Sequence, residues 1–270
     1  MHRNFSNLEK SNSEALWSSY NLVNDYVNKY YENKNLTFFT TGILAKQNRD
    51  LLKQIVQDGH EIASHYYHHN YLENQSLKQI ETELNSAIDA VIHACNVKPI
   101  GFRAPAFSIP VNRNDIFSLI KKYFRYDSSY ILKYQEIISK SYLKNCVFND
   151  QNFTEFPIVT KPYLLNMAQL KSGGSFFRIF SKEIMIDIMN NSHKNGFTPI
   201  VYLHPYDILS EREFWVNLKH LNKGSLNVRI SNWIMQHKYL SLGNKSTISK
   251  LKYLSKHFQH QGTLKNSLRS

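Results

Sequence analysis

The chain has 270 residues, 42% hydrophobic and 13% aromatic, which is enough apolar material for a sizeable core and excludes a disordered chain. Its two cysteines exclude a disulfide scaffold and a multi-cysteine zinc module. The net charge of +12 comes from 33 basic and 21 acidic residues.

Short apolar strands alternate with amphipathic helices along the chain. Such alternation is typical of parallel strands joined by crossover helices, as in α/β proteins. Seven expected strands favour a closed or nearly closed β/α barrel over an open sheet. In chain order we expect a helix over 16–30, a strand over 36–41, a helix over 51–56, a strand over 60–64, a helix over 76–91, strands over 100–104, 123–128 and 155–159, a helix over 181–196, and strands over 199–203 and 238–242. Gly59 ends the second of these helices, and the capping-box spacing of Ser76 and Gln79 opens the third.

Targeting segments are not visible in the sequence as written. No apolar run reaches the roughly 18 residues that a membrane-spanning helix requires. Residues 1–7 lack the apolar core of a signal peptide. We therefore expect no transmembrane segment and, for the chain as written, a cytoplasmic location.

Half of the net charge lies in the last part of the chain. Residues 244–270 contain six basic residues and no acidic one. We therefore expect a barrel domain over 1–243 and a basic tail over 244–270. The tail is either solvated or attracted to an anionic glycan, membrane surface or nucleic acid. No nucleic-acid-binding motif is present, so we expect no nucleic-acid partner.

Polar side chains follow several of the predicted strands. In a β/α barrel, the active site lies at the carboxyl ends of the strands. Segments far apart in sequence would therefore converge there. They are Thr41-Gly42, His65 to His69, Arg103 to Pro105, Asp127 to Ser129, and His204-Pro205.

Two histidines in this set have the spacing of metal ligands. His65 and His69 are four residues apart, which on a helical turn places both rings on one face and suits one metal ion. Because the chain contains 12 histidines, coincidence is the alternative. We expect His60, at the start of its strand, to be structural and His68 to be a bystander.

Three further residues at the strand ends are candidates for catalysis. The Arg103 guanidinium either orients a carboxylate or binds a substrate oxygen, or it is an ordinary surface arginine. His204 ends an apolar run and is either an acid–base group or a buried histidine with its hydrogen bonds satisfied. Asp127 either orients His204 or Arg103, or forms a turn with its own backbone.

Five segments resemble the polysaccharide deacetylases of the NodB homology type, and they occur in the order found in that family. A sixth, SGGSFFR at 172–178, resembles a glycine-rich segment of a bacterial branch that is linked to exopolysaccharide or capsule loci. The five are LTFFTTG at 36–42, GHEIASHYYHH at 59–69, GFRAPAFS at 101–108, YDSS at 126–129 and VYLHPY at 201–206.

The resemblance implies a distorted β/α barrel with one divalent metal ion, most often zinc. His65 and His69 would be two of its ligands, an aspartate would be the third, and a neighbouring aspartate would be the general base. The metal would polarise the acetyl carbonyl and lower the pKa of its bound water. His204 would be the general acid and Arg103 would orient the base, whereas Asp127 matches the fourth motif loosely.

Aromatic residues near these motifs are candidates for substrate binding. Tyr66, Phe107 and Tyr206 either stack on sugar rings or pack in the core. The expected partner is an N-acetylated polysaccharide or oligosaccharide.

The sequence departs from the family at its beginning. Both family aspartates belong to a strand upstream of the TFF segment, but the only aspartate before residue 36 is Asp25, in a predicted helix. We therefore expect the first strand, one metal ligand and the base to lie before Met1. Three explanations stay open: the start is misplaced or the gene split, catalysis has been lost while glycan binding is retained, or another acidic residue replaces the missing one.

These observations predict a metal-dependent hydrolase that removes N-acetyl groups from a polysaccharide by cleaving a linear amide C–N bond. O-deacetylation at the same site is the related chemistry. The alternative is a catalytically inactive or truncated deacetylase homologue that binds glycan without turnover.

Overall fold

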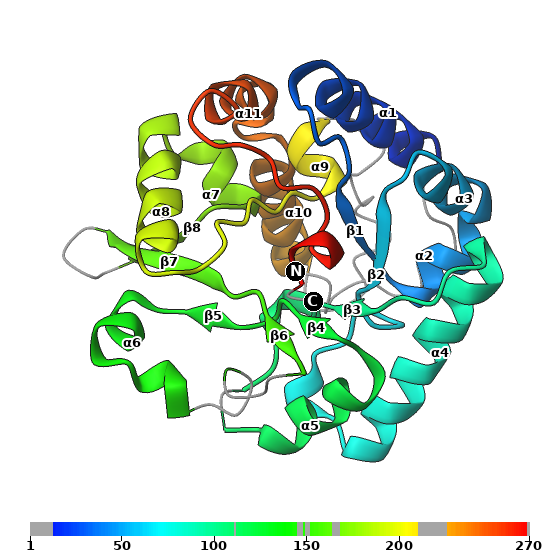
Figure 1. Ribbon diagram of the computed structural model, residues 1–270. Coiled ribbons are helices and arrows are strands. Elements are labelled where there is room, and N and C mark those ends of the chain that lie inside the picture. The colour runs from blue at the N-terminus through cyan, green and yellow to red at the C-terminus, as the bar shows by residue number, and fades with distance from the viewer. Residues whose placement is uncertain are drawn as a thin grey trace. The chain divides into compact units, whose positions relative to one another are not determined.

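The computed structural model describes residues 13–110, 112–144, 148, 152–163, 168–209 and 226–268. The chain divides into two compact units, whose elements are labelled in Figure 1. The first unit comprises Met1–Glu32, Lys171–Asp187 and Ile200–His260, and the second comprises Asn33–Leu170, Ile188–Pro199 and Gln261–Ser270.

The second unit is built on parallel strands. Its main sheet has the order β1-β2-β3-β4-β6, and every neighbouring pair is parallel. A second sheet has the order β5-β7-β8. The main-sheet strands are β1 (Thr37–Thr40), β2 (Glu61–Ser64), β3 (Gly101–Phe102), β4 (Tyr126–Asp127) and β6 (Thr154–Glu155); the others are β5 (Ile131–Leu132), β7 (Ile158–Tyr163) and β8 (Ala168–Lys171).

The predicted parallel α/β architecture is confirmed, but the described strands do not close a barrel. They form an open five-stranded sheet and a separate three-stranded one. Three of the main-sheet strands are only two residues long, so each contributes few ladder hydrogen bonds. β1 lies at one edge of the main sheet. The expectation of a further strand before it stays a prediction.

Helices of the second unit lie outside its strands in Figure 1. The predicted capping box is present: Gln79 N donates to Ser76 Oγ, and Ser76 N donates to Gln79 Oε1 at 2.9 Å. The helix that follows buries one face in a core shared with Phe102 and Phe117. The helices are α2 (Gly42–Gln47), α3 (Arg49–Gln57), α4 (Leu77–Cys95), α5 (Asn114–Tyr123) and α6 (Tyr134–Ser139).

The first unit is mainly helical. Residues 199–203 do not form the predicted strand but only an isolated bridge between Gly173 and Tyr202. The helices are α1 (Ser13–Tyr30), α7 (Gly174–Ile179), α9 (Pro205–Ile208), α10 (Leu226–Ser241) and α11 (Thr247–Leu254), while α8 (Lys182–Lys194) begins in this unit and ends in the other.

The strand predicted over 238–242 is wrong, because these residues belong largely to α10. A short apolar run does not by itself distinguish a strand from part of a longer helix. No glycine or proline interrupts 226–241, and Gly243, at a φ of 80°, follows the helix end.

The segment predicted as a basic tail contains folded structure. Thr247 and Leu254 of α11 are buried. Lys250 Nζ donates to the carbonyl oxygens of Phe177, Arg178 and Phe180 at 2.9, 2.6 and 2.7 Å. This lysine is therefore a structural residue rather than a solvated one, and the expected boundary at 243 stays a prediction.

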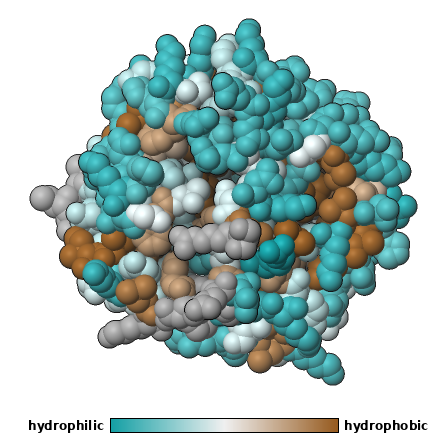
Figure 2. Space-filling view, in the orientation of Figure 1, coloured by the Kyte–Doolittle hydropathy of each residue, from teal (hydrophilic) through white to brown (hydrophobic). Residues whose placement is uncertain are grey.

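The surface shown in Figure 2 is mostly hydrophilic, with separate apolar patches. Within the described part of the chain, no helix is both long and apolar enough to cross a membrane.

Candidate functional site

The two candidate ligand histidines lie in the loop after β2. His65 follows the last residue of the strand, and the backbone turns through positive φ angles at Tyr66 (70°) and His69 (63°). The ring centroids of His65 and His69 are 5.0 Å apart. The two rings therefore lie close together, but a loop with two left-handed residues brings them there, not the predicted helical turn.

A hydrogen bond fixes the tautomer of His65. Its Nδ1 lies 2.7 Å from the backbone carbonyl oxygen of Arg103. Because a carbonyl only accepts, the proton is on Nδ1 and the lone pair of the neutral ring is on Nε2. Metal-binding histidines commonly have this arrangement.

The site fits only part of a catalytic zinc centre, which normally has three protein ligands. The imidazoles of His65 and His69 would supply two. In the part of the chain that the structure describes, no group of three or more His, Cys, Asp or Glu side chains could hold a metal ion. The predicted zinc therefore stays a prediction.

Arg103 is a buried arginine whose side chain is hydrogen-bonded to the residue that follows β4. The residue is 8% exposed. Its Nε donates to the Ser128 carbonyl oxygen at 3.1 Å and its Nη2 to Ser128 Oγ at 2.7 Å. Its guanidinium lies 4.2 Å from the centroid of the Phe39 ring, within cation–π range. These contacts hold the guanidinium in one place, while the backbone carbonyl oxygen of the same residue bonds His65 Nδ1.

Asp127 ends β4 and is fully buried. Ser129 Oγ donates to its Oδ1 at 2.5 Å. The carboxylate bonded to His204 Nδ1 is Asp207, while the role of Asp127 in orienting Arg103 stays a prediction.

His204 is held by a residue that the sequence reasoning missed. It caps the N-terminus of α9, and Asp207 Oδ2 accepts from both its backbone N and its Nδ1, each at 2.8 Å. Nδ1 therefore carries a proton, and Nε2 is left for other partners. The His204 side chain is 45% exposed, so it is not a buried core histidine. The three-residue spacing of a capping box was the sequence signal for Asp207.

Arg178 forms a buried ion pair with Asp207. Its Nε lies 2.6 Å from Asp207 Oδ1, and the two side chains are 1% and 0% exposed. Its Nη1 donates to Asn244 Oδ1 at 2.9 Å and to the Leu242 carbonyl oxygen at 3.0 Å. The arginine thus fixes the carboxylate that fixes His204. It is the last residue of the glycine-rich segment at 172–178, to which the sequence reasoning gave no individual role.

The predicted sugar-binding aromatics have different environments. Tyr66 is fully buried in the core and its hydroxyl donates to Gln75 Oε1 at 2.8 Å, so its ring is not available to stack on a sugar. Tyr206 is half-buried and stacks on His204, with ring centroids 4.7 Å apart. Phe107 is half-buried, at a φ of 56°. Tyr206 and Phe107 stay candidates for sugar contact.

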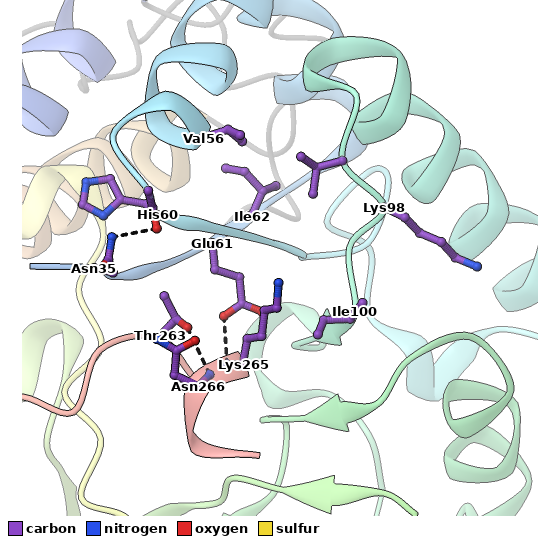
Figure 3. Close-up of a pocket in the computed structure, with 12 residues that line it drawn as sticks. Asn35, Val56, His60, Glu61, Ile62, Lys98, Ile100, Thr263, Lys265 and Asn266 are labelled. Carbon is purple, nitrogen blue, oxygen red and sulfur yellow. Dashed lines mark hydrogen bonds between the residues drawn. The ribbon is translucent and has the colours of Figure 1, made fainter. Parts of the chain in front are cut away.

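His60 is structural, as predicted, at the opposite end of β2. It accepts a hydrogen bond on Nδ1 from Leu36 N at 3.1 Å, and burial lowers its pKa. A cavity of about 260 Å³ lies beside it (Figure 3). Lys265 N, in the last segment of the chain, donates there to Glu61 Oε2 at 3.1 Å. This segment therefore contacts the amino end of β2, away from the histidine pair.

The glycine at 173 makes room for Tyr202. A Cβ there would lie 2.2 Å from Tyr202 Cδ1, while the φ of −169° is open to any residue. Gly173→Ala is therefore expected to lower the free energy of unfolding by about 1–3 kcal/mol through overpacking alone. Urea denaturation measures this. In a Tyr202→Ala background the same substitution is expected to cost little, and an equal cost in both backgrounds would contradict the steric explanation.

Comparison with known proteins gives a family match for each of two stretches of the chain. Residues 19–121 match the family model of the polysaccharide deacetylases, and residues 139–261 match a domain of unknown function, DUF3473. The first stretch includes the histidine pair and Arg103; the second includes Arg178, His204 and Asp207. The chain therefore contains a polysaccharide deacetylase domain.

Two curated relatives illustrate the match. The chain is 35% identical to chitin deacetylase 2 of Saccharomyces cerevisiae over 71 residues, which is 26% of this chain and 23% of the relative. It is 38% identical to the peptidoglycan-N-acetylmuramic acid deacetylase PdaA of Bacillus subtilis over 55 residues, 20% of this chain and 21% of the relative. The matched segments thus span less than a quarter of either relative.

Among solved structures, a candidate polysaccharide deacetylase from Mycobacterium smegmatis is similar to this chain with a TM-score of 0.49 and 17% identity. The alignment covers 92% of this chain and 81% of that one.

Proposed function

We propose that this chain is a hydrolase that removes N-acetyl groups from a polysaccharide or oligosaccharide by cleaving the amide C–N bond. The observation that carries the proposal is the fixed geometry of His204 in a chain with a polysaccharide deacetylase domain. Asp207 holds the Nδ1 proton and Arg178 holds Asp207. A half-exposed imidazole with Nε2 free of that bond is suited to donating a proton to the departing sugar amine.

The other residues receive proposed roles from their chemistry. His65 and His69 would hold a divalent metal ion, zinc being the first choice, together with a ligand that the described residues do not supply. When bound, such an ion polarises the acetyl carbonyl and activates water. Arg103 would orient an acidic base or bind a substrate oxygen, and Phe107 and Tyr206 would contact sugar rings. An exported or capsular glycan is the proposed substrate class.

Acetate release from N-acetylglucosamine oligomers, measured with and without added zinc, tests the proposed activity. Zinc-dependent release is the expected result. Binding of the oligomer without acetate release at any zinc concentration would overturn the proposed activity and support the non-catalytic alternative.

Zinc binding tests the histidine pair independently of activity. Calorimetric titration is expected to show that His65→Ala and His69→Ala each weaken zinc binding by at least about tenfold. His68→Ala is the matched control, because His68 lies between them in sequence and pairs with Glu83 at 3.5 Å. Unchanged zinc affinity in both ligand variants would contradict the assignment.

A further inference from the structure

A pair of carboxyl groups lies side by side at the carboxyl end of the main sheet. Asp127 and Glu155 are directly opposite each other on the neighbouring parallel strands β4 and β6. One oxygen of each is accounted for: Asp127 Oδ1 accepts from Ser129 Oγ, and Glu155 Oε1 accepts from Tyr130 N at 3.0 Å. The other two oxygens, Asp127 Oδ2 and Glu155 Oε2, are buried and lack a conventional donor.

Charge balance disfavours two anions at this place. Neither carboxylate forms an ion pair with a basic side chain of the described residues. Arg103, from the end of β3, is the charged group that favours ionisation of Glu155, and its Nε and Nη2 donate to Ser128. The neighbouring titratable residue on β4, Tyr126, donates to Glu61 instead. Two adjacent buried carboxylates repel each other and lose hydration.

One shared proton removes the repulsion between the two carboxylates and supplies the donor that their buried oxygens lack. If it lies between Asp127 Oδ2 and Glu155 Oε2, one carboxyl becomes a donor and the other its acceptor, so both oxygens gain a partner. The electrostatics agree. Burial raises the pKa of Asp127 to about 6, and burial together with the charge of Asp127 raises the pKa of Glu155 well above its usual value.

We propose that Asp127 and Glu155 share one proton in the folded chain and form a proton-binding site that positions the backbone at Arg103 and Ala104. Ser129 makes the connection. Its hydroxyl donates to Asp127, so it accepts from Ala104 N, at 2.7 Å. The preceding carbonyl, that of Arg103, is the one bonded to His65 Nδ1. The carboxyl pair thus positions the peptide that fixes the His65 tautomer.

The pH dependence of stability tests the shared proton. The pKa values of Asp127 and Glu155 are raised in the folded chain, so the folded chain binds more protons than the unfolded chain. The stabilisation that the shared proton contributes is therefore lost as the pH rises from about 4 through 6 and above. The unfolding equilibrium constant of the native sequence is expected to increase by up to about tenfold per pH unit in this range. Glu155→Gln carries a permanent donor and is expected to flatten that dependence. Glu73→Gln, at an exposed position, is the matched control.

A direct measurement accompanies the denaturation series. Infrared difference spectroscopy at neutral pH is expected to show a protonated-carboxyl band that disappears in Glu155→Gln. Absence of that band in the native sequence, or the same pH dependence in Glu155→Gln as in the native sequence, would overturn the shared proton. Neither readout involves substrate, so each is independent of the proposed deacetylase activity.

The positioning role has its own readout. Nitrogen NMR of the His65 ring is expected to show the Nδ1-protonated tautomer in the native sequence and in Glu155→Gln. A change in tautomer populations is expected in Glu155→Ala and in Ser129→Ala. An unchanged His65 signal in both alanine variants would overturn the positioning role even if the proton is shared.

Discussion

Replacement of His204 by alanine is expected to lower acetate release from N-acetylglucosamine oligomers by about 10²- to 10⁴-fold, the usual contribution of a positioned general acid. The effect should fall on kcat, because the proton is needed when the amine departs. His193→Ala, at an exposed position of α8, is the matched control and should retain full activity. A His204→Ala variant with native kcat would remove this histidine from the mechanism.

Asp207→Asn separates the role of the ring from the role of its partner. The amide keeps only one acceptor oxygen, and when that oxygen faces Arg178 Nε the NH2 group faces His204 Nδ1, so the ring loses the bond that fixes its tautomer. We expect a smaller loss of kcat than in His204→Ala and a displaced pH profile. Parallel losses without any change in the pH profile would indicate that Asp207 only supports the fold.

Arg178→Met is expected to have the largest effect on stability. It removes one partner of an ion pair that is almost completely buried and leaves the Asp207 charge uncompensated. Breaking such a pair costs about 3–5 kcal/mol of the free energy of unfolding. Chemical denaturation measures this.

A surface pair on the same chain provides the control. Arg113 contacts Asp115 at 2.8 Å, but their side chains are 28% and 42% exposed. Exposed pairs contribute about 0–1 kcal/mol, so Arg113→Met should be nearly neutral. Equal losses in the two methionine variants would show that burial does not decide the strength of the Arg178–Asp207 pair.

Local sequence signals predicted the elements that depend on near neighbours. The spacing of Ser76 and Gln79 predicted the start of α4 because a capping box is formed by residues three apart. The alternation of strands and helices predicted parallel pairing, since crossover connections require it. The segments that follow β2, β3 and β4 also held the residues of the candidate site, because the carboxyl ends of parallel strands meet at one edge.

Where the pattern allowed two structures, the wrong one was predicted. The apolar residues near 238–242 fit a strand or the end of a helix, and only the complete helix α10 decided between them. The number of expected strands suggested barrel closure, but closure depends on pairing between the first and last strands, which sequence periodicity does not report.

The tertiary structure decided those partners of the candidate site residues that lie far apart in the sequence. Arg178 and Asp207 are separated by 28 intervening residues, yet form a buried ion pair. No sequence motif marks Glu155, and strand pairing alone brings it opposite Asp127. The sequence by itself determined the residue types and the local turns that present His65, Arg103 and His204. That Asp207 contacts Arg178, and that Glu155 lies opposite Asp127, depends on the packing of distant segments, because burial and strand register set those distances and no local spacing encodes them.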